Sequence, residues 1–200
     1  LFRSKKVRFI AFGGLAISDN NGESFVRYST VPVFERTEEA SLFRVPHTVM
    51  LDNAKFKFWY GGGSSYIDGT NKTLPVYNIR YLESNSLINI PDKGIEVLDT
   101  IDEEHRVGRP NVLKDNELFK MYFGFGSDKK PYQLGYAESK KKKNWSRDDL
   151  KLGLPLSSSG WDSEMMAYPC VVKVNNKTYM FYNGNEYGKY GFGYAELVQE

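Results

Sequence analysis

VPHTVMLDNAKFKFWYGGG (Val45–Gly63), RPNVLKDNELFKMYFGFG (Arg109–Gly126) and YPCVVKVNNKTYMFYNGN (Tyr168–Asn185) are three stretches built on one plan. In each stretch a proline opens a short run of strand-forming residues, a turn rich in Asp and Asn follows, and an aromatic second strand ends in or beside glycine. Asp and Asn tolerate the positive φ angles that tight hairpins require. The sequence therefore predicts three β-hairpins of the same design.

Each hairpin is followed, after a variable loop, by a third strand-like run. These runs are YNIRYLES (Tyr77–Ser84), QLGYAES (Gln133–Ser139) and GFGYAEL (Gly191–Leu197). The prolines that open the units, Pro46, Pro110 and Pro169, recur 64 and 59 residues apart, and no helical pattern lies between them. Antiparallel four-stranded units at such a period are typical of β-propeller blades, whereas a two-sheet sandwich does not require three copies of one plan. We predict an all-β propeller.

The repeat divides the chain into one propeller domain over residues 1–200, with a partial blade at 1–40 and blades at about 41–102, 103–160 and 161–200. The opening run RFIAFGGLAISDNNGESF resembles the third strand of a unit and its following turn. About three and a half blades are fewer than the roughly four to eight that close a ring. We expect N-terminal blades outside this sequence, or self-association, to close it.

The same motifs carry a resemblance to a known family. The pattern begins with P-x-V, continues with an Asp/Asn turn and an aromatic strand that ends in Y-x-G, and has GYAES and Trp after it. It spans Pro110–Gly126 with Gly135–Trp145, and Pro169–Gly184 with Gly193–Leu197. It is similar to blades of the five-bladed propellers of glycoside hydrolase families 43, 32, 62 and 68. The resemblance covers nearly the whole chain, and it is specific for the fold and weak for the reaction. It implies a carbohydrate-active protein of glycoside-hydrolase type.

Strand direction predicts where a site lies. If the first strand of each blade runs down the central channel, the Asp/Asn turns lie at the bottom. The segments that enter the first strands and those that join second to third strands then share the top face. They are Leu42–His47, Glu103–Asn111, Asp162–Tyr168, Gly61–Pro75, Gly124–Tyr132 and Asn183–Tyr190. We call this face the channel mouth.

Acids at the mouth are candidates for catalysis. Glycoside hydrolysis uses two carboxyl groups about 5 to 5.5 Å apart for retention, or about 6.5 to 9.5 Å apart for inversion. Glu164 and Glu104 hold corresponding positions before their prolines, and Asp162 is a near alternative. The other interpretation is that these acids cap turns or pair with nearby arginines.

Two departures from the family pattern concern its catalytic acids. The resemblance implies a glutamate two residues before such a proline, but Arg44, Gly108 and Ala167 stand there. The resemblance also implies a catalytic aspartate in the first blade of the propeller, and this sequence lacks that blade.

Basic and polar side chains at the mouth are candidates for binding. Arg44, Arg106 and Arg109, together with His47, suit the carboxylate or phosphate group of an anionic sugar or sugar phosphate. The alternative is that each arginine neutralises a glutamate. Further candidates are the ring of Tyr168, which suits sugar stacking, and the loop residues Asn183 and Asn185.

Two functions of different class therefore remain open. One is hydrolysis or transfer of a glycosyl unit. The other is non-catalytic recognition of a sugar or sugar phosphate within a glycan-assembly system.

Composition excludes several other functions. The 27 basic and 25 acidic residues are interleaved, so no attraction to nucleic acid follows from charge, and the SKKKKNW run (Ser139–Trp145) is interpreted as a solvated hairpin. One cysteine and two histidines predict neither a metal site nor a disulfide, and no cofactor is expected. No apolar run approaches the roughly 20 residues of a membrane span. No signal peptide is visible, which slightly favours the cytoplasm.

Overall fold

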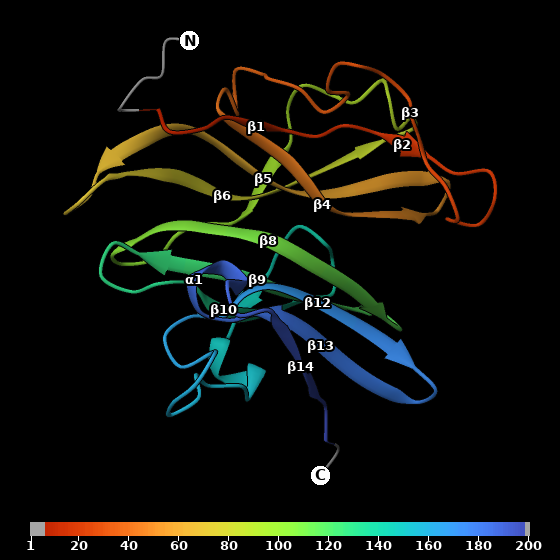
Figure 1. The fold of residues 1–200 in the computed structure, drawn as a ribbon. Helices are drawn as coiled ribbons and strands as arrows, with labels where there is room; N and C mark the ends of the chain where they lie inside the picture. The colour runs from red at the N-terminus through yellow and green to blue at the C-terminus, as the bar shows by residue number, and fades with distance from the viewer. Residues whose placement is uncertain (1–6, 199–200) are drawn as a thin grey trace.

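A computed structural model describes residues 7–198, and its regular secondary structure is almost entirely β-strand. Figure 1 shows three blades that lie one beside the next. The first blade contains β4 (Phe43–Asp52), β5 (Lys55–Asp68), β6 (Thr73–Ser84) and β7 (Ile95–Leu98). The second contains β8 (Glu104–Asp115), β9 (Leu118–Ser127), β10 (Gln133–Ser139) and β11 (Ser146–Arg147), followed by the 3-10 helix η1 (Asp149–Leu152). The third contains β12 (Ala167–Val174), β13 (Lys177–Asn183) and β14 (Phe192–Glu196), with the short helix α1 (Asn185–Gly188) before β14.

The first strands of the three blades, β4, β8 and β12, each pair with the second strand of their own blade and not with one another. Side chains join them instead. The Thr48 hydroxyl donates to the Pro110 carbonyl (2.8 Å) and accepts from the Val112 N–H (3.0 Å), and the Asn111 side-chain oxygen accepts from the Val171 N–H (2.9 Å). The all-β, propeller-like fold is thus confirmed, whereas the number of blades in a closed ring stays a prediction.

The hairpin turns have the predicted chemistry. Each turn between first and second strand has two loop residues, and Asn53, Ala54, Asn175 and Asn176 all have positive φ angles of 48° to 67°. Such angles match the right-handed twist of the flanking strands.

Three of the segments expected at the mouth are mostly strand, and Leu42–His47 is one of them because β4 begins at Phe43. β8 begins at Glu104, so the expected entrance loop Glu103–Asn111 pairs with β9, and the hairpin of β5 and β6 extends to Asp68 and Thr73. Backbone pairing continues there through β-bulges, which re-aim side chains without ending a strand.

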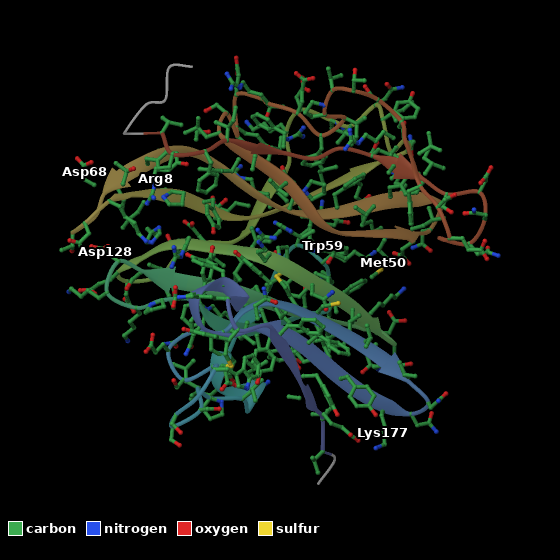
Figure 2. The ribbon with its side chains drawn as sticks, in the orientation of Figure 1. Arg8, Met50, Trp59, Asp68, Asp128 and Lys177 are labelled. Carbon is green, nitrogen blue, oxygen red and sulfur yellow. The ribbon has the colours of Figure 1, made fainter. Side chains whose placement is uncertain are left out.

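The core lies between successive blades. Trp59, Ile79 and Tyr81 of the first blade pack on Val112 and Met121 of the second, and Figure 2 shows Trp59 and Met50 in this layer. Leu134 of the second blade packs in the same way on residues of the third, among them Met166, Val171, Met180 and Tyr182.

The N-terminal segment forms β1 (Ala11–Phe12), β2 (Ala16–Ile17) and β3 (Val26–Arg27). β1 pairs in parallel with β4, just as the third strand β6 of the first blade pairs in parallel with β8 of the next. The segment therefore takes the place of a third strand. Phe34, which follows it, is buried against Phe58 and Tyr60 on the outer side of the first blade.

The ends of the strands that hold the Asp/Asn turns carry paired charges. The carboxylate of Asp52 pairs with Lys57, with Lys114 of the second blade (3.0 Å) and with Lys142 (3.0 Å). Asp115 holds the equivalent position in the second blade and pairs with a lysine of its own blade and one of the third. Each turn aspartate therefore links two blades electrostatically.

Candidate functional site

A cavity of about 600 Å³ opens at the mouth end of the strands. Figure 2 shows Arg8, Asp68 and Asp128 at this end and Lys177, the first residue of β13, at the other. Four cations line the cavity: Arg8, Lys72, Arg106 and Arg109. Six aromatic rings line it as well: Phe9, Phe43, Tyr77, Tyr132, Tyr168 and Tyr187. No Asp or Glu side chain from residues 7–198 does so.

Arg106 supplies the most deeply buried of the cationic groups. Only 8% of the residue is exposed, and its Nε has no hydrogen-bond partner among the described residues. The guanidinium stacks on the ring of Tyr132, with 4.0 Å between its central carbon and the ring centroid. Gly126 makes room for it, because a Cβ there would lie 3.0 Å from Nε. A buried guanidinium without an acid partner is costly, so it points to a missing anion.

Arg109 and Tyr168 reach the cavity through strained backbone. They have φ angles of 57° and 61°, and each precedes a proline at a β-bulge. A positive φ at a non-glycine residue costs about 1 to 3 kcal/mol and persists where the surroundings impose it, often at functional sites. The strain brings the two together, with the Arg109 guanidinium 4.0 Å from the centroid of the Tyr168 ring.

The four tyrosines come from four segments of the three blades and form one connected cluster. The hydroxyls of Tyr77 and Tyr132 are hydrogen-bonded, and the ring of Tyr168 stacks on that of Tyr187 with an interplanar angle of 27°. The ring of Tyr132 contacts both Tyr168 and Tyr187. Burial raises the pKa of Tyr77 well above its usual range, so this hydroxyl stays protonated. The cluster offers flat apolar faces beside hydroxyl groups, as a sugar ring requires.

His47 lies in the bulge between Pro46 and Thr48 and lines the cavity opposite Gly61. Burial lowers the pKa of its imidazole to about 3, and the positive charge of Arg109 adds to this effect. His47 is therefore a neutral donor and acceptor at pH 7.

Of the predicted binding residues, the structure brings His47, Arg106, Arg109 and Tyr168 to one cavity. It does not bring Arg44 there. Arg44 is buried in the first blade, where it stacks on Phe34 (4.1 Å), donates to the Glu35 and Pro91 carbonyls and approaches the Glu39 carboxylate (3.7 Å). Arg44 thus joins the core of its own blade.

Asn183 and Asn185 also lie outside the cavity lining. The Asn185 amide accepts from the Glu164 and Met165 N–H groups (2.9 and 3.0 Å) and donates to the Gly160 carbonyl (3.0 Å). The Asn183 amide donates to the carbonyl of Tyr187 (3.0 Å), which fixes the segment that carries a cavity ring.

The three candidate acids do not meet in the cavity either. Glu104 forms a bidentate pair with Arg147 (2.8 and 3.0 Å), so this acid is neutralised within the second blade. Asp162 is buried and accepts from the Tyr182 hydroxyl (2.8 Å). Burial, together with this hydrogen bond, raises the pKa of Tyr182 to about 12. Glu164 is exposed, and the expectation that it shares a cavity with Arg106, Arg109 and His47 is not met.

The lining residues that were not among the predicted site residues include Arg8, Lys72 and Tyr77. Lys72 and Tyr77 stand at the tip and early part of the β5–β6 hairpin, and Tyr77 opens a run interpreted only as a third strand. Gly108 was a sequence signal for Tyr77, because the absent side chain of this glycine leaves room for the ring. A Cβ at Gly108 would lie 2.7 Å from the Tyr77 ring.

Within residues 7–198, no group of three or more His, Cys, Asp or Glu side chains is arranged to hold a metal ion. A separate search of the same residues finds no helix with the length and apolar character needed to span a membrane.

Comparison with known sequences finds similar but uncharacterized proteins. No protein-family model matches the chain. It is 31% identical over 185 residues to the uncharacterized protein Rv1502 of Mycobacterium tuberculosis strain H37Rv, and equally to the uncharacterized protein MT1551 of strain CDC 1551. The match covers 92% of this chain and 60% of each relative. The chain therefore spans less than two thirds of the curated relatives that it matches.

Comparison with solved structures identifies the fold. A thermostable family-43 glycoside hydrolase matches with a TM-score of 0.68 at 16% identity, over 94% of this chain and 63% of the other. A second glycoside hydrolase matches with the same TM-score of 0.68 at 16% identity, over 94% and 57%. The GH32 β-fructofuranosidase BmSUC1 of Bombyx mori, in complex with sucrose, matches at 0.61 and 17%, over 94% and 39%. The three blades have the fold of glycoside-hydrolase propellers.

Proposed function

We propose that this protein is a carbohydrate-active protein of glycoside-hydrolase type whose channel mouth binds an anionic sugar, with a carboxylate or phosphate group held by Arg106 and Arg109. The observation that carries the proposal is the buried guanidinium of Arg106, which faces the cavity without a carboxylate partner among the described residues. A guanidinium offers paired donors that fit both oxyanions.

The rest of the cavity supports a sugar as the carrier of that anion. The Tyr168 and Tyr187 rings provide stacking faces, and the neutral imidazole of His47 provides a hydrogen-bonding group. Four cations without a lining acid make the potential of the cavity positive, which favours anions over neutral ligands. We expect neutral sugars to bind more weakly than uronic acids or sugar phosphates of the same ring.

Glycosyl hydrolysis or transfer is the second candidate, and the shared fold with glycoside hydrolases favours it. The reaction requires two carboxyl groups at the cavity. Glu104, Asp162 and Glu164 stay predictions for that role, but none of them lines the cavity. If this second candidate holds, the catalytic carboxyl groups come from polypeptide outside the described residues. If no such carboxyl groups are supplied, the protein recognises the sugar without cleaving it.

Calorimetric titration of the full-length protein with glucose, glucuronic acid and glucose 6-phosphate tests the proposal. The expected result is binding of at least one anionic sugar that weakens as salt is raised, with weaker binding of glucose. Equal affinity for the neutral and anionic sugars would refute anion recognition. Release of reducing sugar from neutral and anionic glycans, measured in parallel, separates hydrolysis from binding alone.

A further inference from the structure

The hairpin of β5 and β6 reaches further at the mouth than its counterparts in the other two blades. In those blades, pairing between the second and third strands ends at Phe125 and at Asn183. In the first blade it continues past Gly62, the equivalent of Phe125, for four further pairs over residues 65–76. We call residues 65–76 the extension. It gives the first blade a wall of the cavity that the other two blades do not provide.

Hydrogen bonds at two points hold the extension in place. The Tyr66 hydroxyl accepts from the Phe9 N–H (3.1 Å) and donates to the Phe9 carbonyl (2.7 Å). At the tip, the Asp128 carboxylate of the second blade accepts from the N–H and the hydroxyl of Thr70, both at 2.6 Å. The extension is thus fixed to the N-terminal segment and to the second blade, and it contributes a run of cavity-lining residues: Lys72, Thr73, Leu74 and Pro75.

The four lining cations form two separate pairs. Arg106 pairs in register with Tyr77, and Lys72 stands five residues before Tyr77 on the same arm of the hairpin. A strand rises about 3.3 Å per residue, so Lys72 lies on the order of 15 Å along the hairpin from the level of Arg106. Arg8 precedes Phe9, which is bonded to the extension. We call Arg106 and Arg109 the inner cations, and Arg8 and Lys72 the outer cations.

The outer cations are exposed, and no carboxylate from residues 7–198 lines the cavity beside them. Asp128 stands near Lys72 but is engaged elsewhere. The hydrogen bonds from Thr70 lower the pKa of the Asp128 carboxyl, and the charge of Lys72 adds to this effect. The outer cations are therefore open to an anion that enters from solvent.

Aromatic rings join the two pairs of cations. The Phe9 ring lies 5.2 Å from that of Phe43, which lies 5.7 Å from that of Tyr77, measured between centroids. The hydroxyl of Tyr77 is bonded to that of Tyr132, and the ring of Tyr132 contacts that of Tyr168. The lining is thus a continuous aromatic surface with cations at both ends, and it is longer than a single sugar ring.

We propose that the ligand is an acidic oligosaccharide, with one anionic group on the inner cations and a second on the outer cations. This inference rests on the proposed function, because the inner cations are the anion site proposed there. The sugar rings between the two anionic groups lie along the aromatic surface. The repeated anion is the carboxylate of a uronic acid or the phosphate of a phosphodiester-linked glycan, since guanidinium and ammonium groups bind both.

Calorimetric titration of the full-length protein with acids of different length tests the proposal. The probes are galacturonic acid, trigalacturonic acid and the fully methyl-esterified trimer, which keeps the rings and removes the charges. The acidic trimer should bind more tightly than the monomer by a factor of about three to thirty, as two exposed charge pairs allow, and the esterified trimer should not. Mannose 6-phosphate and a phosphodiester-linked trimer of it form the second arm, and the arm with the larger gain identifies the anion.

Two double variants locate the second anionic group. Arg8→Gln with Lys72→Gln should remove the advantage of the acidic trimer over the monomer. Arg27→Gln with Lys141→Gln changes the net charge equally at exposed positions outside the cavity lining, and it should keep that advantage.

The outcomes separate this inference from the proposed function. Binding of a monomeric acid with no gain for either trimer would overturn the inference and leave the proposed function standing. Binding of no acid at all would overturn both. A gain shared by the esterified trimer, or an equal loss of that gain in the two double variants, would also overturn the inference, because the outer cations would then play no specific part.

Discussion

The two ends of the channel hold cations in opposite ways. At the turn end, the lysines around Asp52 and Asp115 are paired with carboxylates that link neighbouring blades. At the mouth, Arg106 and Arg109 stack on tyrosine rings and have no carboxylate partner in the part of the chain that the structure describes. Removing one partner of a buried pair leaves a charge uncompensated and destabilises the fold, whereas we propose that the unpaired guanidinium of Arg106 is retained for a ligand at a cost in stability.

The largest effect is expected at the turn end. Asp52→Asn removes the carboxylate that three lysines share, and it leaves the buried Lys57 without a counter-charge. We expect the free energy of unfolding to fall by about 2 to 4 kcal/mol. Denaturant unfolding measures this, with Asp68→Asn at the exposed hairpin tip as the control. A loss equal to that of the control would remove the contrast between the two ends.

The next effect concerns binding at the mouth. Arg109→Ala removes a charged donor from the cavity, and we expect affinity for an anionic sugar to fall by about 1.5 to 3 kcal/mol. Arg27→Ala, at an exposed arginine of β3, should change nothing. Calorimetric titration of both variants provides the measurement, and unchanged affinity in Arg109→Ala would assign this arginine a purely structural role.

The pH dependence of stability reports on His47. An unfolded histidine has a pKa near 6.5, and the folded value is about 3, so between these values the unfolded chain binds the extra proton. Stability contributed by neutral His47 is present above pH 6.5 and falls as the pH drops toward 3, by at most about 1.4 kcal/mol per pH unit. His47→Gln should flatten the unfolding free energy over this range, and an unchanged slope would contradict the assigned pKa.

The smallest effect is expected at Glu164. Its side chain is exposed and does not line the cavity, so Glu164→Gln should leave both sugar affinity and any turnover of the full-length protein unchanged. Abolished turnover with intact binding would instead restore Glu164 as a catalytic acid and require the entrance segment to rearrange.

The repeat was readable from sequence because it rests on local signals. The prolines, the Asn turns and the aromatic second strands recur at one spacing, and the hairpins form where these signals stand. Strand direction alone also placed His47, Arg106 and Arg109 at one end of the channel, where they share a cavity.

The orientation of individual side chains was not readable, because it depends on bulges and on distant partners. A shift of one residue turns a side chain to the other face of a strand, and the bulges at Arg109 and Tyr168 introduce such shifts. Glu104 pairs with Arg147, 43 positions further along the chain, rather than with the nearby Arg106. The nearness of Glu104 and Arg106 in the sequence therefore suggested the wrong partner for each of them.

Arg106→Met tests the central claim most directly, because it replaces the buried guanidinium with an apolar side chain of similar length. If Arg106 is retained for a ligand, chemical denaturation without ligand should give an unfolding free energy equal to or above that of the unmodified protein. Binding of an anionic sugar should be lost at the same time. A loss of stability as large as that of Asp52→Asn, with sugar binding retained, would show that Arg106 serves the fold and would contradict the account.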